Sequence, residues 1–381
     1  MKLIPFIMPF VLLASTSSSC DGGGGDDPVV VEETISTSPA SLSCTAEAQT
    51  LKLEVKASKG FEAYSNDEWV KKVDPSYSPS GTGTVSITVD ENVKREPRTG
   101  EITVKVGSTR KKVPLSQDAA AEPTVPTPEG YTLVWRDEFD GGSVSSGNWK
   151  FENWSKGWVN NELQYYVAGG EFDGVETASV KDGILSITAQ KYNGSGKFNN
   201  QTDINGQVIS ARMNTRKSWK YGYMEARIKL PKGKGTWPAF WMMPDDQSLG
   251  WPACGEVDIM EEVGVNPNRT SSSIHCKAYN HTIGTQKTAE RLTKGAEDDF
   301  HVYAVEWTAD YMQFYVDGST SGCLRFENDK KGNVDTWPFN KTFYITLNLA
   351  WGGDWGGMKG VDESALPCTL QVDYVRVFQK Q

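Results

Sequence analysis

Four carboxylates stand within seven residues of the segment Gly255-Glu-Val-Asp-Ile-Met-Glu-Glu262. Its apolar residues predict a strand, in which Glu256 and Asp258 point to the same face. Glu261 would point to the opposite face unless one extra residue near Met260 forms a β-bulge. With that bulge three carboxylates converge, and at least one pKa should rise, as a general acid at neutral pH requires. A solvated acidic strand face is the alternative interpretation.

Tryptophans surround this segment. Trp237 and Trp241 lie in Gly235-Thr-Trp-Pro-Ala-Phe-Trp-Met-Met-Pro244, and Trp251 comes shortly before Glu256. Pyranose rings present apolar faces that stack on indole rings, while paired carboxylates supply the acid and the nucleophile of glycoside hydrolysis. The combination therefore favours a site that cuts sugar chains over a solvated acidic face.

Strands must position these groups. Apolar and polar residues alternate along Met224–Leu230, the period-2 pattern of a half-buried strand. Similar runs begin at Gly183, His301, Met312, Phe343 and Gln371, and no stretch shows a long helical period. About 250 residues of strands are too many for one flat sheet, so we expect two sheets packed face to face. The predicted fold class is all-β.

Residues 35–118 form a separate stretch of short alternating strands, which predicts a small β-sandwich. Its residues Trp69, Ser80-Gly-Thr-Gly83, Asn92 and Arg98-Thr-Gly100, with a terminal Ser116-Gln117, resemble a BACON-type domain. The resemblance implies a position between a lipid anchor and a glycan-active domain. We expect a spacer rather than a glycan-binding module, because Trp69 is a lone aromatic. Residues 119–130 are Pro-rich and predict a semi-rigid linker to a domain over 131–381.

The first residues resemble the signal peptide of a bacterial lipoprotein. Lys2 precedes a short apolar run and a small-residue zone that ends before Cys20. The resemblance implies removal of residues 1–19, lipidation of Cys20, and display on the outer membrane at the cell surface. Residues 20–34 follow as an acidic, Gly-rich spacer. An ordinary secretory signal with an incidental cysteine is the alternative.

Composition narrows the function classes. The chain has 381 residues and a net charge of −10, which argues against nucleic acid as a partner. Twelve of the thirteen Trp lie after residue 131, so the two halves differ in kind. Five Cys follow Cys20, without a CxxC pair, and a Cys323–Cys368 disulfide is open.

The segment Glu256-Val-Asp-Ile-Met-Glu261 resembles the ExDxxE motif of glycoside hydrolase family 16, in the bulged form of laminarinase-like members. Further matches cover nearly all of 131–381 in the family's order: Leu133–Gly141, Asn160–Tyr166, Tyr221–Pro231, Gly235–Trp241, Leu347–Gly353 and Val372–Val377. The resemblance implies a β-jelly-roll of two curved antiparallel sheets and a retaining, endo-acting hydrolase.

The resemblance also assigns roles. Glu256 would be the nucleophile, Glu261 the acid and base, and Asp258 an electrostatic helper between them. The residues that would hold the sugar chain are Trp237, Trp241, Trp251, Asn161, Arg212, His275, Asn348 and Trp351. Trp355, on the other side of Gly352-Gly-Asp354, is a further candidate on the same loop. A structural, hydrogen-bonded role is the alternative for His275. Val159 and Glu262 depart from the family's glycine and aromatic at their positions, which affects one end of the cleft.

A metal site is predicted only from the same resemblance. Catalysis would need no cofactor. Many family members carry a calcium ion, and the matching residues here are Glu138, Gly183 and Asp373, which would offer main-chain and carboxylate oxygens. A solvated Asp373 is the alternative.

These observations predict a monomeric surface lipoprotein that hydrolyses β-1,3-glucan or mixed-linkage β-1,3/1,4-glucan. A red-algal galactan such as agarose or porphyran is the second candidate substrate, although the acidic chain does not suit sulfated polymers. A non-catalytic glycan-binding protein is the rival from another class. The complete carboxylate set argues against it.

Overall fold

The computed structural model describes residues 32–94, 96–120 and 125–380. The signal segment, Cys20 and most of the acidic spacer lie outside the described residues. The chain divides between residues 122 and 123 into two compact units, each with its own core. Among the described residues, no helix has the length and apolar character needed to cross a membrane.

The smaller unit consists of two sheets, as the alternating pattern predicts. One has the order β1 (Ile35–Ser38), β3 (Gln49–Ala57), β7 (Thr82–Val89) and β5 (Val70–Asp74). The other has the order β2 (Leu42–Cys44), β9 (Thr109–Gln117), β8 (Arg98–Val106), β4 (Phe61–Tyr64) and β6 (Tyr77–Ser78). Trp69 packs against the core of this unit, and the Arg98 guanidinium lies 4.5 Å from its ring centroid.

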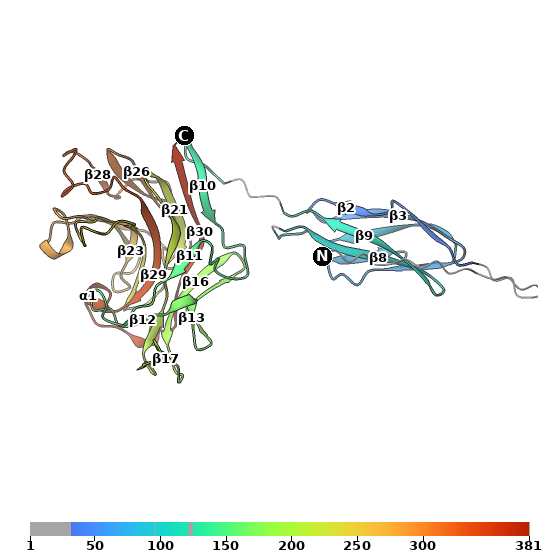
Figure 1. Ribbon diagram of the computed structural model, residues 1–381, viewed down its shortest axis with the longest axis horizontal. Coiled ribbons are helices and arrows are strands. Elements are labelled where there is room, and N and C mark those ends of the chain that lie inside the picture. The colour runs from blue at the N-terminus through green and yellow to red at the C-terminus, as the bar shows by residue number, and fades with distance from the viewer. Residues whose placement is uncertain (1–31, 95, 121–124, 381) are drawn as a thin grey trace, which may run out of the picture. The chain divides into compact units, whose positions relative to one another are not determined.

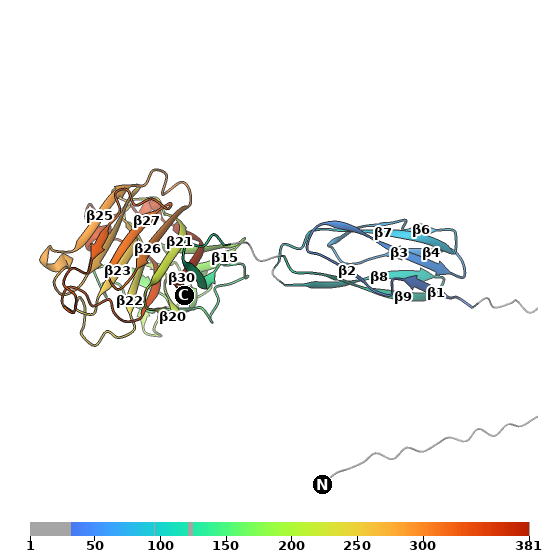
Figure 2. The ribbon, with the colours of Figure 1, turned by 90° about the horizontal axis from the view of Figure 1, so that it is seen from above.

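The larger unit is dominated by two sheets whose strands curve, visible in Figure 1. The ten-stranded sheet runs β12 (Gln164–Tyr166), β19 (Val208–Ser210), β16 (Ile184–Lys191), β30 (Cys368–Lys380), β21 (Gly222–Lys229), β26 (His301–Trp307), β27 (Tyr311–Val316) and β28 (Arg325–Glu327). Two more strands pair beside this path, β10 (Tyr131–Asp137) with β30 and β15 (Ala178–Lys181) with β16. Figure 2 shows β21, β26 and β27 side by side.

The seven-stranded sheet carries the predicted site. Its order is β11 (Trp149–Phe151), β20 (Arg212–Trp219), β29 (Phe343–Trp351), β22 (Thr236–Pro244), β23 (Glu256–Glu262), β24 (Arg269–His275) and β25 (Lys287–Leu292). The remaining elements are short: η1 (Ala168–Gly170), β13 (Glu171–Phe172), β14 (Val175–Glu176), β17 (Lys197–Phe198), β18 (Thr202–Asp203), η2 (His281–Ile283), α1 (Gly353–Gly356) and η3 (Glu363–Ala365). This arrangement confirms the predicted all-β jelly-roll.

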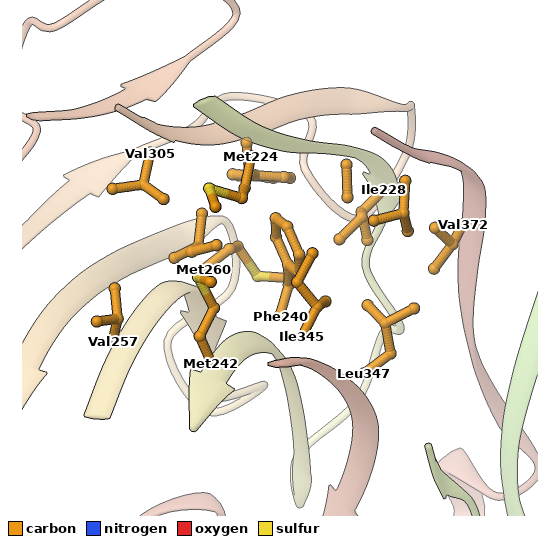
Figure 3. Close-up of a cluster of buried hydrophobic side chains, with 14 of the residues drawn as sticks. Met224, Ile228, Phe240, Met242, Val257, Met260, Val305, Ile345, Leu347 and Val372 are labelled. Carbon is orange, nitrogen blue, oxygen red and sulfur yellow. The ribbon is translucent and has the colours of Figure 1, made fainter. Parts of the chain in front are cut away.

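The core of the larger unit lies between its two main sheets. Figure 3 shows Met224 and Val305 of the ten-stranded sheet facing Phe240, Met242 and Met260 of the seven-stranded one. All five side chains are buried, and each such side chain contributes roughly 1.5–3 kcal/mol through burial. The core thus fixes one face of β22 and β23, and most polar residues of these strands use the other.

The five described cysteines are free thiols, so the Cys323–Cys368 disulfide is absent from the structure. The sheet order explains this result. Cys323 lies two residues before the start of the edge strand β28, whereas Cys368 begins β30, four strands away in the same sheet. At about 4.8 Å per strand the separation is roughly 19 Å, and disulfide-bonded Cα atoms lie within about 7 Å of each other.

Candidate active site

A β-bulge lies between Asp258 and Glu261 on β23. On the neighbouring strand β24, the single residue Ser272 faces two residues of β23. The Ser272 hydroxyl donates a 2.9 Å hydrogen bond to the main-chain carbonyl of Ile259, which satisfies a buried group inside the bulge. The bulge confirms the prediction from the sequence, and it returns Glu261 to the face that carries Glu256 and Asp258. We call this the carboxylate face of the seven-stranded sheet.

Strand register places polar residues in rows across the carboxylate face, because residues directly opposite each other share a face. The first row contains Arg212, Asn348, Ala239, Glu261 and Ser271. The second contains Asn214, Thr346, Trp241, Asp258 and Ser273. Residues more than 130 positions apart in the sequence are thus neighbours in the sheet.

Each of the three carboxyl groups has a specific partner. The indole N–H groups of Trp251 and Trp237 donate to Glu256 and Glu261, at 2.9 Å and 3.0 Å respectively. Asp258 is only 3% exposed, and its Oδ2 lies 3.3 Å from Nε2 of His275. One ligand atom each from Glu256, Asp258 and His275 lie within 4.8 Å of one another, a spacing that could also hold a metal ion.

Burial and mutual repulsion raise the pKa values of the cluster. Burial, followed by the charge of Asp258, raises the pKa of Glu256 to about 8. Burial also raises the pKa of Asp258, and burial together with Asp258 raises that of Glu261 well above its usual range. His275, Trp251 and Arg212 partly offset the rise by lowering the pKa of Glu256. For Glu261 the groups that lower the pKa are Trp237 and His275. Glu256 is therefore the easier of the two glutamates to ionise, and Glu261 keeps its proton longer.

A polar network extends from the carboxylates toward the β11 edge. The Arg212 guanidinium lies 4.7 Å from the Trp241 ring centroid, and its Nε lies 2.8 Å from a carboxylate oxygen of Glu152. Trp241 donates its indole N–H to Oδ1 of Asn348, and Nδ2 of Asn348 donates to the hydroxyl of Tyr166. Both ends of the Asn348 amide are engaged, so this side chain orients Trp241. Sequence reasoning missed Glu152 and Tyr166 as members, although Tyr166 ends one of the motifs quoted above.

The predicted role of Trp351 is wrong. Its side chain is 1% exposed and belongs to the core, and its main-chain N–H donates to the buried Gln164 side chain. Trp355, four residues beyond the end of β29, is instead half-buried with its ring centroid 5.5 Å from that of Trp237. The exposed Asn161 side chain is bonded to Asp354 of the same loop at 2.8 Å. Sequence spacing alone could not tell which of Trp351 and Trp355, on either side of Gly352 and Gly353, is buried in the core.

Trp251 has an aromatic neighbour that sequence reasoning missed. The indole is 40% exposed and lies 5.0 Å from the ring of His281, at the start of η2. His275 is 7% exposed and lies 5.1 Å from His281. His275 sits directly opposite Glu256 on β24, so it lies at the site, as the sequence predicts.

The residues predicted to hold calcium are engaged in ion pairs. Both carboxylate oxygens of Glu138 accept hydrogen bonds from Arg376, at 2.8 and 2.9 Å, and Asp373 lies 2.6 Å from Arg227. Gly183 offers only main-chain groups in the turn between β15 and β16. A calcium ion at this position would have to compete with Arg227 for Asp373 and to use main-chain oxygens of the other two residues.

Comparison with known proteins agrees with this geometry. The family model for glycosyl hydrolases family 16 matches residues 171–376, and the BACON model for an N-terminal binding domain matches residues 59–118. A β-glucanase from Rhodothermus marinus is 42% identical over 259 residues, covering 65% of this chain and 85% of that protein.

Solved structures give the same result. A crystal structure of a mutant of SCLam, described as a non-specific endo-β-1,3(4)-glucanase, is 45% identical with a TM-score of 0.61, covering 66% of this chain and 96% of the other. The laminarinase from Rhodothermus marinus is 42% identical with a TM-score of 0.59, covering 65% and 97%. The chain belongs to glycosyl hydrolases family 16, with a BACON domain preceding the hydrolase domain.

Proposed function

We propose that the protein is an endo-β-1,3(4)-glucanase that hydrolyses laminarin-type β-1,3-glucan or mixed-linkage β-glucan with retention of configuration. The observation that carries the proposal is the bulge in β23, which brings Glu256, Asp258 and Glu261 onto one face beside three tryptophans. Two carboxyl groups that flank a glycosidic bond supply the nucleophile and the acid of a retaining hydrolase.

Glu256 acts as the nucleophile, because the Trp251 N–H and Arg212 favour its charged form. Its carboxylate attacks the anomeric carbon, forms the glycosyl-enzyme bond and displaces the leaving sugar. Glu261, which keeps its proton longer, protonates the departing oxygen and then removes a proton from the attacking water. Water cleaves the covalent intermediate and regenerates Glu256. Asp258 raises the pKa of Glu261 and so holds the acid in its working state.

A neutral glucan suits the charge of the protein better than a sulfated galactan does. The net charge is −10, so a sulfated chain would be repelled by the protein as a whole. The β-glucanase of Rhodothermus marinus and the SCLam structure, both above 40% identity, support the same substrate class.

The remaining parts of the proposal concern location and organisation. The protein would be a monomer, anchored through Cys20 in the outer membrane and displayed at the cell surface, with the BACON domain as a spacer. Packing of the partly buried Trp69 against its own core supports a spacer rather than a binding module. Calcium stays a prediction, and a shift of the melting temperature on adding calcium or a chelator would test it.

The deciding experiment is a product profile on laminarin, barley mixed-linkage glucan, lichenan and agarose. We expect oligosaccharide ladders from the first three polymers, typical of internal cleavage, and a β-anomer as the first product by NMR. Release of oligosaccharides from agarose alone would show that the protein is a galactanase instead. Binding without any product, in a sample with an intact Glu256 and Glu261, would favour the non-catalytic class.

A further inference from the structure

Two stacked tryptophans lie in the loop that follows β11, at the edge of the seven-stranded sheet. Their ring centroids are 4.1 Å apart with an interplanar angle of 14°. Trp158 is 58% exposed, and Trp154 beneath it is half-buried. Trp158 directly precedes Val159, one of the two positions at which the chain departs from the family's pattern. We call this pair the edge platform.

The loop holds the edge platform in place. The main chain of Trp154 exchanges two hydrogen bonds of 3.0 Å with Tyr166, the residue whose hydroxyl accepts from Asn348. The N–H of Gly157 donates to the carbonyl of Glu162 at 2.7 Å and closes the loop behind Trp158. An indole kept rigid with one open face loses little conformational entropy when a ligand covers it.

The edge platform is continuous with the polar network of the site. The Trp154 indole N–H donates to the Glu152 carboxylate, which pairs with Arg212, whose guanidinium covers Trp241. The elements that supply these residues follow the sheet order from the β11 edge to β22, next to the catalytic strand. Four strand spacings separate β11 from β23, or roughly 19 Å. A ligand that spans this distance is a chain of several sugar residues.

The open face of a rigid, stacked indole pair suits the apolar face of a pyranose. We propose that the edge platform is a remote subsite for a glucose residue of the polysaccharide, several residues away from the bond that is cleaved. The inference rests on the proposed β-glucanase function. It assigns Trp158 as the contact residue and Trp154 as its support.

Kinetics on a series of laminari-oligosaccharides of increasing length, together with laminarin, test the proposal. In the wild type kcat/KM should rise once the chain is long enough to reach the platform. In W158A the ratio of kcat/KM on laminarin to that on the shortest substrate should fall roughly tenfold, through KM rather than kcat. W158Y should restore most of the ratio, and Y77A should match the wild type because it removes an equally exposed aromatic ring from the smaller unit.

Three outcomes would overturn the assignment. An unchanged ratio in W158A means that the edge platform does not contact the chain. An equal loss on short and long substrates means that Trp158 only supports the fold of the loop. If the wild type cleaves no β-glucan at all, the proposed function is wrong, and the assignment of a glucose subsite is then wrong as well.

Discussion

The indole N–H of Trp237 donates a 3.0 Å hydrogen bond to a carboxyl oxygen of Glu261. This bond favours the charged form of a group that burial and Asp258 otherwise hold protonated. The acid and base of a retaining hydrolase must be protonated when the leaving sugar departs and ionised when water attacks. The bond from Trp237 therefore affects how readily Glu261 changes between these two forms.

Replacing Trp237 with Phe removes the donor and keeps most of the ring. The pKa of Glu261 should rise further, so the alkaline limb of the pH profile of kcat/KM should move to higher pH. We expect a loss of about tenfold in kcat, since a hydrogen bond to a charged group contributes roughly 1.5–3 kcal/mol. If the alkaline limb does not move, the ionisation that it reports is not that of Glu261.

The variants E256Q and E261Q should separate the two catalytic roles. Both should lose at least about a hundredfold in laminarin hydrolysis, because each lacks a group that takes part in bond cleavage. On an aryl glucoside with a good leaving group, E261Q should still release the phenol in its first turnover, since that step needs little acid help, while E256Q should not. Oligosaccharide binding by calorimetry serves as the control for folding. Equal activity of the two variants on the aryl substrate would contradict the assignment.

Ser272 should stabilise the bulge. S272A leaves the buried carbonyl of Ile259 without its donor and should cost about 1–3 kcal/mol of stability in the larger unit. S271A is a matched control, because the neighbouring Ser271 hydroxyl is equally buried and has no hydrogen-bond partner. Differential scanning calorimetry should show a lower melting temperature for S272A only. Equal melting of the two variants would mean that the bulge does not need this hydroxyl.

Glu262 should make stability depend on pH. Its side chain points into the interior, accepts one hydrogen bond from the N–H of Asn268, and has its other oxygen unpartnered. Burial and then Glu297 raise its pKa from 4.5 to about 8. The folded state therefore binds more protons than the unfolded state between these values, and stability falls as pH rises through that window.

E262Q cannot ionise and keeps an acceptor for Asn268. At pH 9 we expect E262Q to have a higher melting temperature than the wild type and a free energy of unfolding larger by a few kcal/mol as an order of magnitude. Near pH 5 the two proteins should differ little. Melting curves between pH 4.5 and 9 measure this difference. Parallel curves for the two proteins would show that Glu262 does not titrate in this range.

Local pattern was enough to predict the strands and the central chemistry. Alternation located β21 and β26, and the parity of Glu256, Asp258 and Glu261 required the bulge that the structure contains. These features depend on residues close together in the sequence, for which the period of a strand decides the direction of each side chain.

Contacts between distant segments could not be predicted in the same way. Glu152 and Arg212 are 60 positions apart, and only the pairing of β11 with β20 brings them together. Trp351 and Trp355 flank the same glycines, yet β29 carries the first into the core and α1 leaves the second near Trp237. Pairing with Arg227 likewise engages an Asp373 carboxylate that looks free in the sequence.

Ala239 stands between Asn348 and Glu261 in the first row of the carboxylate face, where its neighbours are long and polar. Its methyl group is the smallest side chain of this row and lies beside the acid. Enlarging Ala239 by one heavy atom at a time, through Ser, Val and Leu, would fill the space beside Glu261 stepwise without adding a charge, and it offers protein engineers a way to tune which sugar ring and linkage the enzyme accepts.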